Sequence, residues 1–318
     1  MFLFVVILYH NKRLNISLAF HCLVIKMNND KLYWEITQRS LGVYSREEQE
    51  KIRKGKVAIV GVGCDGGMDA YILTRMGIGC LRLIDFDINE LSNMNRQPMA
   101  IYSTRGLPKV YSAKSIIQDL NPTVDVESIN AKLTEDNAEE LLKGCDVALQ
   151  GMDSMVGRII FHRATKKLGI PSITMTGQPP FRSFVSTIMP DGPAYEELFG
   201  INFMIGKTFK DNPDLEENVK NLKYERAEHS AKLSGQKDWL KEYKQGKAGW
   251  GITPERAYLT SVYQCHEALA ILTDRKPKAI APKAYVSDLK GLEEFGHPES
   301  LVAILSPFNG KNWDYRMF

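Results

Sequence analysis

Short apolar runs alternate with longer segments in which apolar residues recur at helical spacing, from Lys56 onward. The first pattern predicts buried strands and the second predicts amphipathic helices. The predicted strands are Val57–Val60, Leu81–Ile84, Val124–Ile129, Val147–Gln150, Ser172–Thr176, Val185–Met189 and Ala284–Ser287. The predicted helices are Met68–Met76, Lys109–Leu120, Glu135–Leu142, Val156–Leu168 and Pro254–Leu272. This regular alternation predicts an α/β fold: a mainly parallel sheet with helices on both faces, extended by a mixed C-terminal part.

Two segments depart from the alternation. Residues 1–27 contain the apolar run Phe2–Leu8, which is far shorter than the roughly 20 residues of a membrane-spanning helix. No cleavage site follows it, so we expect an N-terminal extension ahead of an alternative start at Met27, with a weak membrane-surface anchor as the alternative. Residues 199–250 are rich in Lys, Glu, Asp and Asn. They predict a charged helical insertion or a mobile crossing segment, with a plain surface linker as the alternative.

Charge and cysteine content narrow the functional class. The net charge of +3 is too small to indicate a nucleic-acid-binding surface, so nucleic acid is not an expected partner. The five cysteines contain no C-x-x-C pair. This spacing argues against a disulfide framework and a structural zinc site, and it suits the reducing cytoplasm.

The strand Val57–Val60 runs directly into a glycine turn that begins at Gly61 and contains Gly63 and Gly66. A strand, a G-x-G-x-x-G turn and a helix bind phosphate because small residues let backbone N–H groups approach an anion, which is typical of Rossmann-like folds. Asp85 follows the second strand, where a carboxylate can accept hydrogen bonds from ribose hydroxyls. NAD and ATP would both fit these features.

Two cations favour nucleotidyl transfer over hydride transfer. Arg96 ends an Asn-rich segment that includes Asn93, and Lys109 opens a predicted helix after Gly106-Leu107-Pro108. Charge that develops on phosphate oxygens must be met by fixed positive groups. The alternative for each residue is an exposed charged side chain.

Asp153 follows the strand Val147–Gln150 and the small residue Gly151, with Arg158 on the next helix. A carboxylate at the carboxyl end of a strand lies where open α/β sheets bind ligands, and it could hold Mg²⁺. The alternative is a helix N-cap, a role that Ser154 could fill instead.

In combination, these motifs resemble the family of adenylyltransferases that includes ThiF, MoeB and the ubiquitin-activating enzymes. The resemblance covers about Gln38–Met189 and resumes over Pro254–Leu272. It implies an ATP- and Mg²⁺-dependent enzyme that activates a carboxylate as an acyl-adenylate and releases pyrophosphate. The carboxylate would be the C-terminus of a ubiquitin-like or sulfur-carrier protein, or of a peptide.

The resemblance also implies residue roles. Asp153 would hold the metal, and Arg39 would reach the triphosphate of the partner subunit in a homodimer. The implied nucleotide-binding residues are Gly61, Gly63, Cys64, Gly66, Asp85, Asn93, Arg96 and Lys109. The chain would then divide into an extension at 1–27, an ATP-binding core at 28–198, the crossover insertion at 199–250, and a helix and strand at 251–318 that complete the core.

Three departures from the family pattern stand out. Cys64 replaces the second glycine of the turn, and Asp65 replaces an apolar residue, where its charge would repel a triphosphate unless it points away or meets a cation. The cysteine pair of zinc-bearing members is missing after Asp191-Gly192, so no structural zinc is expected. No cysteine occurs between Gly177 and Gly249, which suggests that the reaction stops at the acyl-adenylate, while Cys265 is expected to be a buried, inert thiol.

Two other functions remain open at this stage. The glycine turn and Asp85 would also serve an NAD(P)-dependent oxidoreductase. Cys64 and Asp65 would suit a non-catalytic partner subunit of an activating enzyme, which keeps the fold without using ATP.

Overall fold

A computed structural model describes residues 28–178 and 182–288. Its strands are β1 (Lys56–Val60), β2 (Cys80–Ile84), β3 (Asp125–Ile129), β4 (Val147–Gln150), β5 (Ser172–Gln178), β6 (Arg182–Ile188) and β7 (Tyr285–Asp288). Its α-helices are α2 (Asn29–Thr37), α3 (Arg46–Lys54), α4 (Cys64–Arg75), α5 (Lys109–Leu120), α6 (Ala138–Leu142), α7 (Met155–Leu168), α8 (Tyr195–Leu198), α9 (Pro213–Ser234), α10 (Lys237–Lys244) and α11 (Pro254–Leu272). Short 3₁₀ turns are η1 (Gln38–Ser40), η2 (Leu91–Asn93), η3 (Tyr102–Thr104) and η4 (Asn202–Met204). The predicted extension at 1–27 lies outside the described residues.

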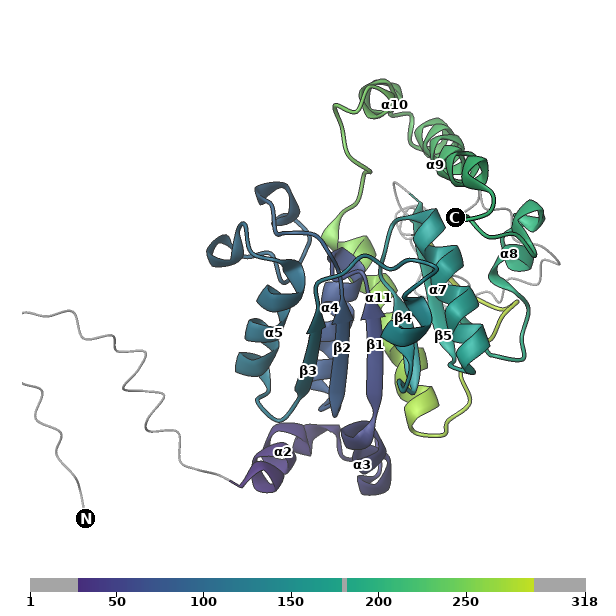
Figure 1. The fold of residues 1–318 in the computed structure, drawn as a ribbon. Helices are drawn as coiled ribbons and strands as arrows, with labels where there is room; N and C mark the ends of the chain where they lie inside the picture. Colours follow the sequence, from purple (N-terminus) through teal and green to yellow (C-terminus); the bar gives the residue numbers. More distant parts are fainter. Residues whose placement is uncertain (1–27, 179–181, 289–318) are drawn as a thin grey trace, which may run out of the picture.

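The seven strands form one sheet in the order β3-β2-β1-β4-β5-β6-β7. The first five run parallel, whereas β6 and β7 pair antiparallel with their neighbours, which confirms the predicted fold class. Within β1, Val57 and Ile59 face one core and Ala58 and Val60 face the other. Both faces are therefore apolar because helices cover both (Figure 1).

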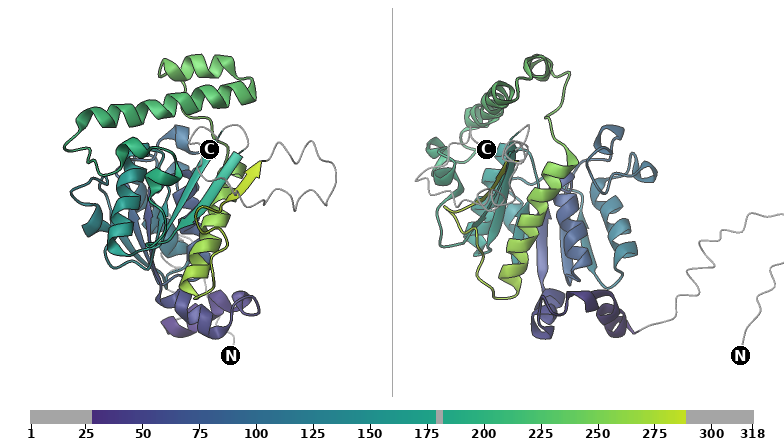
Figure 2. Two further views of the ribbon diagram at one scale, coloured as in Figure 1. Left: turned by 90° about the vertical axis from the view of Figure 1, so that its right-hand side faces the viewer. Right: turned by 180° about the vertical axis from the view of Figure 1, so that it is seen from behind.

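The helices divide between the two faces. α4, α5 and α11 cover one face, where their apolar side chains pack on Val57 and Ile59, and α6 and α7 cover the other (Figure 2). α2 and α3 lie at the amino ends of the parallel strands, whereas α9 and α10 lie above the carboxyl ends (Figure 1). The charged segment predicted at 199–250 is thus helical, and it crosses the edge of the sheet where α/β folds bind ligands.

Two helices begin elsewhere than the sequence pattern predicts. α4 begins at Cys64 rather than Met68, so the glycine turn itself forms the first helical turn. Glycine is a poor helix former, but Gly66 is needed there because of a close backbone approach that is described below. α6 begins at Ala138 rather than Glu135, because residues 134–137 form a turn in which the Asn137 side chain accepts from the Thr134 N–H. In the described part of the chain, no helix has the length and apolar character needed to cross a bilayer.

Candidate active site

The turn after β1 packs directly against the turn after β4. Gly61 has φ +88°, and a Cβ there would lie 2.7 Å from the Gly151 carbonyl carbon. A Cβ on Gly66 would lie 1.9 Å from the Gly61 oxygen. Neither position accepts a side chain, because the clashing atoms belong to the backbone. Gly63 differs, since a Cβ there would meet Gln97 Nε2 at 3.7 Å, an ordinary contact.

The amino end of α4 therefore opens at the carboxyl edge of the sheet. Gly63 is its N-cap, and no side chain caps the helix. The first backbone N–H groups carry the positive end of the helix dipole and can receive an anion. Cys64 does not compete for this position, because its thiol donates to the Arg96 carbonyl oxygen at 3.1 Å. Burial raises the pKa of Cys64 to about 12, so the group is a neutral thiol.

Asp85 is held beside the turn by two backbone donors. Its Oδ2 accepts from the Val62 N–H at 2.6 Å and its Oδ1 from the Asp87 N–H at 2.8 Å. Burial raises the pKa of Asp85, and the neighbouring Lys109 ammonium opposes that rise. The carboxylate is fixed in orientation, and its remaining lone pairs can accept further hydrogen bonds.

Lys109 is the first residue of α5, and it is buried. Its Nζ lies 2.9 Å from Asp87 Oδ2, and its backbone N–H donates to the Asp87 carbonyl at 2.9 Å. The side chain is 8% exposed, which excludes the alternative of an exposed lysine. Its position beside Asp85 brings a cation to the edge where the sequence predicts phosphate.

Asn93 and Arg96 lie on the segment that folds over the amino end of α4. The side-chain oxygen of Asn93 accepts a hydrogen bond from the Glu90 N–H at 3.1 Å. The backbone carbonyl of Asn93 accepts from the N–H groups of Arg96 and Gln97. The Arg96 guanidinium donates to the Ser92 carbonyl at 2.7 Å and to Asn95 Oδ1 at 2.8 Å. These acceptors are local and largely exposed, so the guanidinium remains accessible for an anion.

Asp153 follows Gly151, whose turn contacts Gly61, and its side chain is 81% exposed. Ser154 caps α7 by accepting from the Gly157 N–H, so the Asp153 carboxylate is not used as a helix cap. Lys223 from α9 donates to Asp153 Oδ2 at 2.9 Å. The Asp153 carboxylate is therefore exposed, could act as a metal ligand, and is paired with Lys223.

Arg39 does not join these residues within one chain. It lies in η1 and is exposed. The preceding helix packs at the far end of α4, where the Tyr33 hydroxyl donates to the Gly77 carbonyl at 3.1 Å. The 12 residues of α4 span about 18 Å, so Arg39 is separated from the turn by a helix length.

A cavity of about 60 Å³ lies beside Asp153, and two of its lining residues, Arg226 and Arg256, were not singled out in the sequence. Arg158, Arg226 and Arg256 line it, and each is at least 95% buried. No sequence signal distinguishes Arg226 and Arg256 from ordinary cations of their helices. The lining residues are Asp65, Gly151, Met152, Asp153, Arg158, Met175, Gly177, Lys223, Arg226, Trp250, Ile252 and Arg256.

Asp65 lines this cavity and is buried. Burial raises its pKa to about 6, while Arg256 and Arg158 oppose the rise. The added carboxylate therefore faces cations, which is one of the two arrangements that would relieve its repulsion of a triphosphate. Cys265 is buried in α11, where burial raises the pKa of its thiol and the Asp69 carbonyl lies 3.6 Å away. This matches the expected inert thiol.

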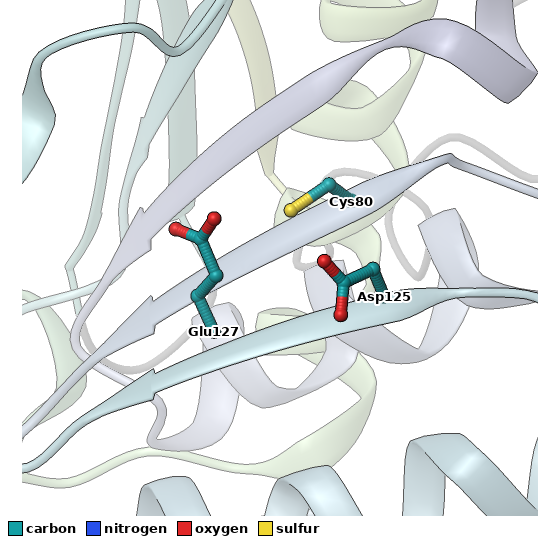
Figure 3. A group of neighbouring side chains, drawn as sticks. All are labelled: Cys80, Asp125 and Glu127. Atoms are coloured by element: carbon teal, nitrogen blue, oxygen red, sulfur yellow. The ribbon is translucent and has the colours of Figure 1, made fainter.

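Among the described residues, Cys80, Asp125 and Glu127 form one group with metal-ligand chemistry (Figure 3). They lie in the amino-terminal halves of β2 and β3, far from the glycine turn. Both Glu127 oxygens are already paired, with Lys56 Nζ at 2.5 Å and Arg82 Nε at 2.6 Å. The carboxylate is charge-compensated, so we assign no metal to this group.

The sequence model of the ThiF family matches residues 37–299. A molybdopterin-synthase adenylyltransferase of Haemophilus influenzae is 35% identical over 155 residues, which cover 47% of this chain and 62% of that protein. The chain spans about half the length of the curated relatives it matches. Their adenylyltransferase and activating-enzyme names favour nucleotidyl transfer over the oxidoreductase alternative.

Two solved structures share the fold. The crystal structure of PaaA has a TM-score of 0.57 at 22% identity, and the match covers 89% of this chain and 73% of that one. Escherichia coli MccB, solved with AMPCPP and MccA, has a TM-score of 0.57 at 17% identity, covering 76% of this chain and 62% of that one.

Proposed function

Because the chain belongs to the ThiF family, we propose that it is an adenylyltransferase that uses ATP to activate a carboxylate of a carrier protein or peptide. The observation that supports this proposal is that Asp85, Lys109 and the segment that carries Arg96 lie around the uncapped amino end of α4. The acid would bind the ribose, and the two cations would bind the phosphates. The proposed compartment is the cytoplasm, since the four cysteines in the described ranges are free thiols.

The proposed reaction is an in-line displacement. Asp85 would accept the ribose hydroxyls, and the first N–H groups of α4, with Arg96 and Lys109, would bind the phosphates. A substrate carboxylate oxygen forms a bond to the α-phosphorus as the bond to the bridging oxygen breaks, and pyrophosphate leaves with the electron pair. No general base is required, because the carboxylate is already ionised at neutral pH. Positioning and charge stabilisation would supply the catalysis.

Asp153 fits a magnesium ligand. Its carboxylate is exposed at the same edge, and carboxylate oxygens suit this hard cation. Mg²⁺ bound there would neutralise charge on the triphosphate. Lys223, which now pairs with Asp153, would supply a second cation to the same region once released.

A second copy of the chain would complete the site. Arg39 cannot reach the turn of its own chain, so it would act from the partner of a homodimer. Large apolar side chains are exposed along the segment that carries Arg96 and Lys109, and a partner protein would cover them. They belong to Phe86, Ile88, Leu91, Met94, Ile101, Tyr102, Leu107 and Tyr111.

ATP–pyrophosphate exchange in the presence of a carboxylate substrate tests the activity. We expect Arg96→Ala and Asp153→Ala each to lower the exchange rate about a hundredfold or more, as when a charge-stabilising donor is removed. The exposed Arg75→Ala, at the far end of α4, is the matched control and should retain exchange. Full exchange in both site variants would refute these assignments, and ATP that fails to raise the melting temperature would favour the non-catalytic subunit.

Subunit complementation tests the dimer. Arg39→Ala and Asp153→Ala homodimers should each be inactive. A mixed dimer, isolated through two different tags, carries one intact site of two and should regain about half of the wild-type rate. A mixed dimer as inactive as its parents would place Arg39 outside the partner's site.

A further inference from the structure

The cavity beside Asp153 carries more positive charge than its own residues compensate. Four cations line it, namely Lys223 and the three buried arginines, against the two acids Asp65 and Asp153. Lys223 already pairs with Asp153. Within the described ranges, none of the three arginines forms an ion pair with a carboxylate, and the Nε atoms of Arg226 and Arg256 have no hydrogen-bond partner.

The neighbouring residues make room for these guanidinium groups and form hydrogen bonds with them. Arg226 donates to Thr176 Oγ1 at 2.6 Å and to the Gly177 carbonyl at 3.2 Å. A Cβ on Gly177 would lie 1.4 Å from Arg256 Nη1, so the glycine leaves the room that this guanidinium fills. Arg158 donates to the Met152 carbonyl at 3.0 Å. Arg158 and Arg226 are thus held by backbone or hydroxyl oxygens, and the Nε donors of Arg226 and Arg256 are free for a ligand.

The free-energy cost of burying these unpaired charges indicates that the cavity binds an anionic ligand. Burial and, to a smaller extent, the nearby Arg158 lower the pKa of Arg226 to about 9. Buried charges without partners are strongly unfavourable, and an incoming carboxylate would pair with them through charge-assisted hydrogen bonds. A volume of about 60 Å³ exceeds the roughly 10–15 Å³ that one water needs, so a carboxyl group fits but a folded carrier does not.

The cavity adjoins the glycine turn on the side away from Asp85. Asp85 follows β2, on one side of β1 and its turn. The cavity lies on the other side, where Asp65 and Gly151 at the turn and residues at the ends of β4 and β5 line it. A carboxylate bound between several guanidinium groups is also a poor nucleophile. The cavity is thus placed for a part of the substrate next to the reacting carboxylate.

On these grounds we propose that Arg158, Arg226 and Arg256 bind an acidic side chain of the substrate, so that the activated polypeptide carries an Asp or Glu beside the carboxylate that is adenylated. This inference rests on the proposed function and adds a substrate class to it: a polypeptide that is acidic at the reacting end. α9 supplies Lys223 and Arg226, so the crossover segment would take part in this selection.

Calorimetric titration of the full chain, loaded with AMPCPP and Mg²⁺, tests the inference with three probes. Acetyl-Gly-Glu-Gly-amide carries only a side-chain carboxylate, acetyl-Gly-Gln-Gly-amide carries none, and acetyl-Gly-Gln-Gly carries only the terminal one. We expect the Glu probe to bind about tenfold to a hundredfold more tightly than the neutral probe, which is the range for one or two hydrogen bonds to charged groups.

Arg226→Met and Arg256→Met should abolish that preference and keep AMPCPP binding, while Arg75→Met should keep both. Melting temperatures check that each variant is folded before its affinities are compared. Equal affinity for the Glu and neutral probes, or no binding of the Glu probe at millimolar concentration, would overturn the inference. Tighter binding of the terminal-carboxylate probe would assign the cavity to the reacting group instead. Failure of AMPCPP itself to bind would count against the proposed function, a separate outcome.

Discussion

Asp85 and Asp65 are both buried at the carboxyl edge of the sheet, yet their surroundings differ. Asp85 accepts two backbone N–H groups of the turns on either side, so its charge is stabilised by the fold. Asp65 Oδ1 has no hydrogen-bond partner, and its neighbours are arginines that are themselves uncompensated. In the proposed site, the acid of the nucleotide half is therefore stabilised by the fold itself, whereas the arginine half has the properties of a site awaiting a ligand.

The two halves also differ in how the chain builds them. Asp85, Arg96 and Lys109 come from one continuous stretch after β2, and backbone hydrogen bonds position that stretch. The arginine cavity gathers side chains from α7, α9 and α11, which are far apart in sequence. A substitution in the nucleotide half should thus act on chemistry, and one in the arginine half on the choice of substrate.

The largest expected effect is on the turn. Gly66→Ala places a Cβ 1.9 Å from the Gly61 oxygen, a backbone clash that no rotamer relieves. We expect a loss of about 3 kcal/mol or more in the free energy of unfolding, together with loss of ATP binding. Gly63→Ala is the matched control, since its nearest contact is ordinary and folding should persist. Urea denaturation compares the two variants, and equal stabilities would contradict the close approach.

Lys109→Met and Lys223→Met compare one cation from each half. Lys109 is buried beside Asp87 and Asp85, so its loss should reduce the exchange rate about a hundredfold. Lys223 pairs with an exposed carboxylate, and its loss should cost less than about tenfold. Exchange assays at saturating ATP measure both rates. Similar losses in exchange rate for the two variants would contradict the separate roles assigned to the two halves.

Asp65→Asn should change how stability depends on pH. The folded pKa of about 6 exceeds the unfolded value of about 3.9, so the native state holds more protons between these pH values. The free energy of unfolding of the wild type should therefore fall as pH rises from about 4 to 6. The amide side chain of the variant does not titrate, so its free energy of unfolding should rise by roughly 1–3 kcal/mol relative to that of the wild type across that range.

Urea denaturation at pH 4.5 and pH 7.5, with the exposed Asp119→Asn as control, measures this difference. The difference in the free energy of unfolding between the wild type and Asp65→Asn could be the same at pH 4.5 and pH 7.5, as it should be for the control. In that case Asp65 is already stabilised as an anion. The arginines would then be compensated internally, which would also weaken the case for an acidic substrate.

The smallest effect concerns Cys64. Its thiol is buried with a pKa of about 12 and donates to a carbonyl, so it takes no part in the proposed chemistry. Cys64→Ala should keep the exchange rate within about threefold, because only a weak hydrogen bond is lost. Iodoacetamide at pH 7.5 should leave this cysteine unmodified in the folded protein, as mass spectrometry of the digested protein would show. Rapid modification would contradict its burial.

The elements of the proposed nucleotide half were predictable from the sequence, because they are local. Glycine spacing, the strand that precedes it and the acid that ends the next strand lie within about thirty residues and act through backbone geometry. The α/β alternation likewise predicted all seven strands, with errors of a few residues at their ends. The start of α4 was misplaced because helix propensity disfavours glycine, whereas tertiary contact with Gly61 requires Gly66 there.

Other properties depended on the tertiary structure alone. The direction of the Asp65 side chain, the burial of Lys109 and the pairing of Asp153 with Lys223 all join residues that sequence spacing does not relate. Arg226 and Arg256 read as ordinary helical cations until α9 and α11 are placed over the ends of β4 and β5. Propensity and periodicity are short-range properties of the chain and determine its elements, but the charge balance of a cavity depends on how distant elements pack, and only the folded chain decides it.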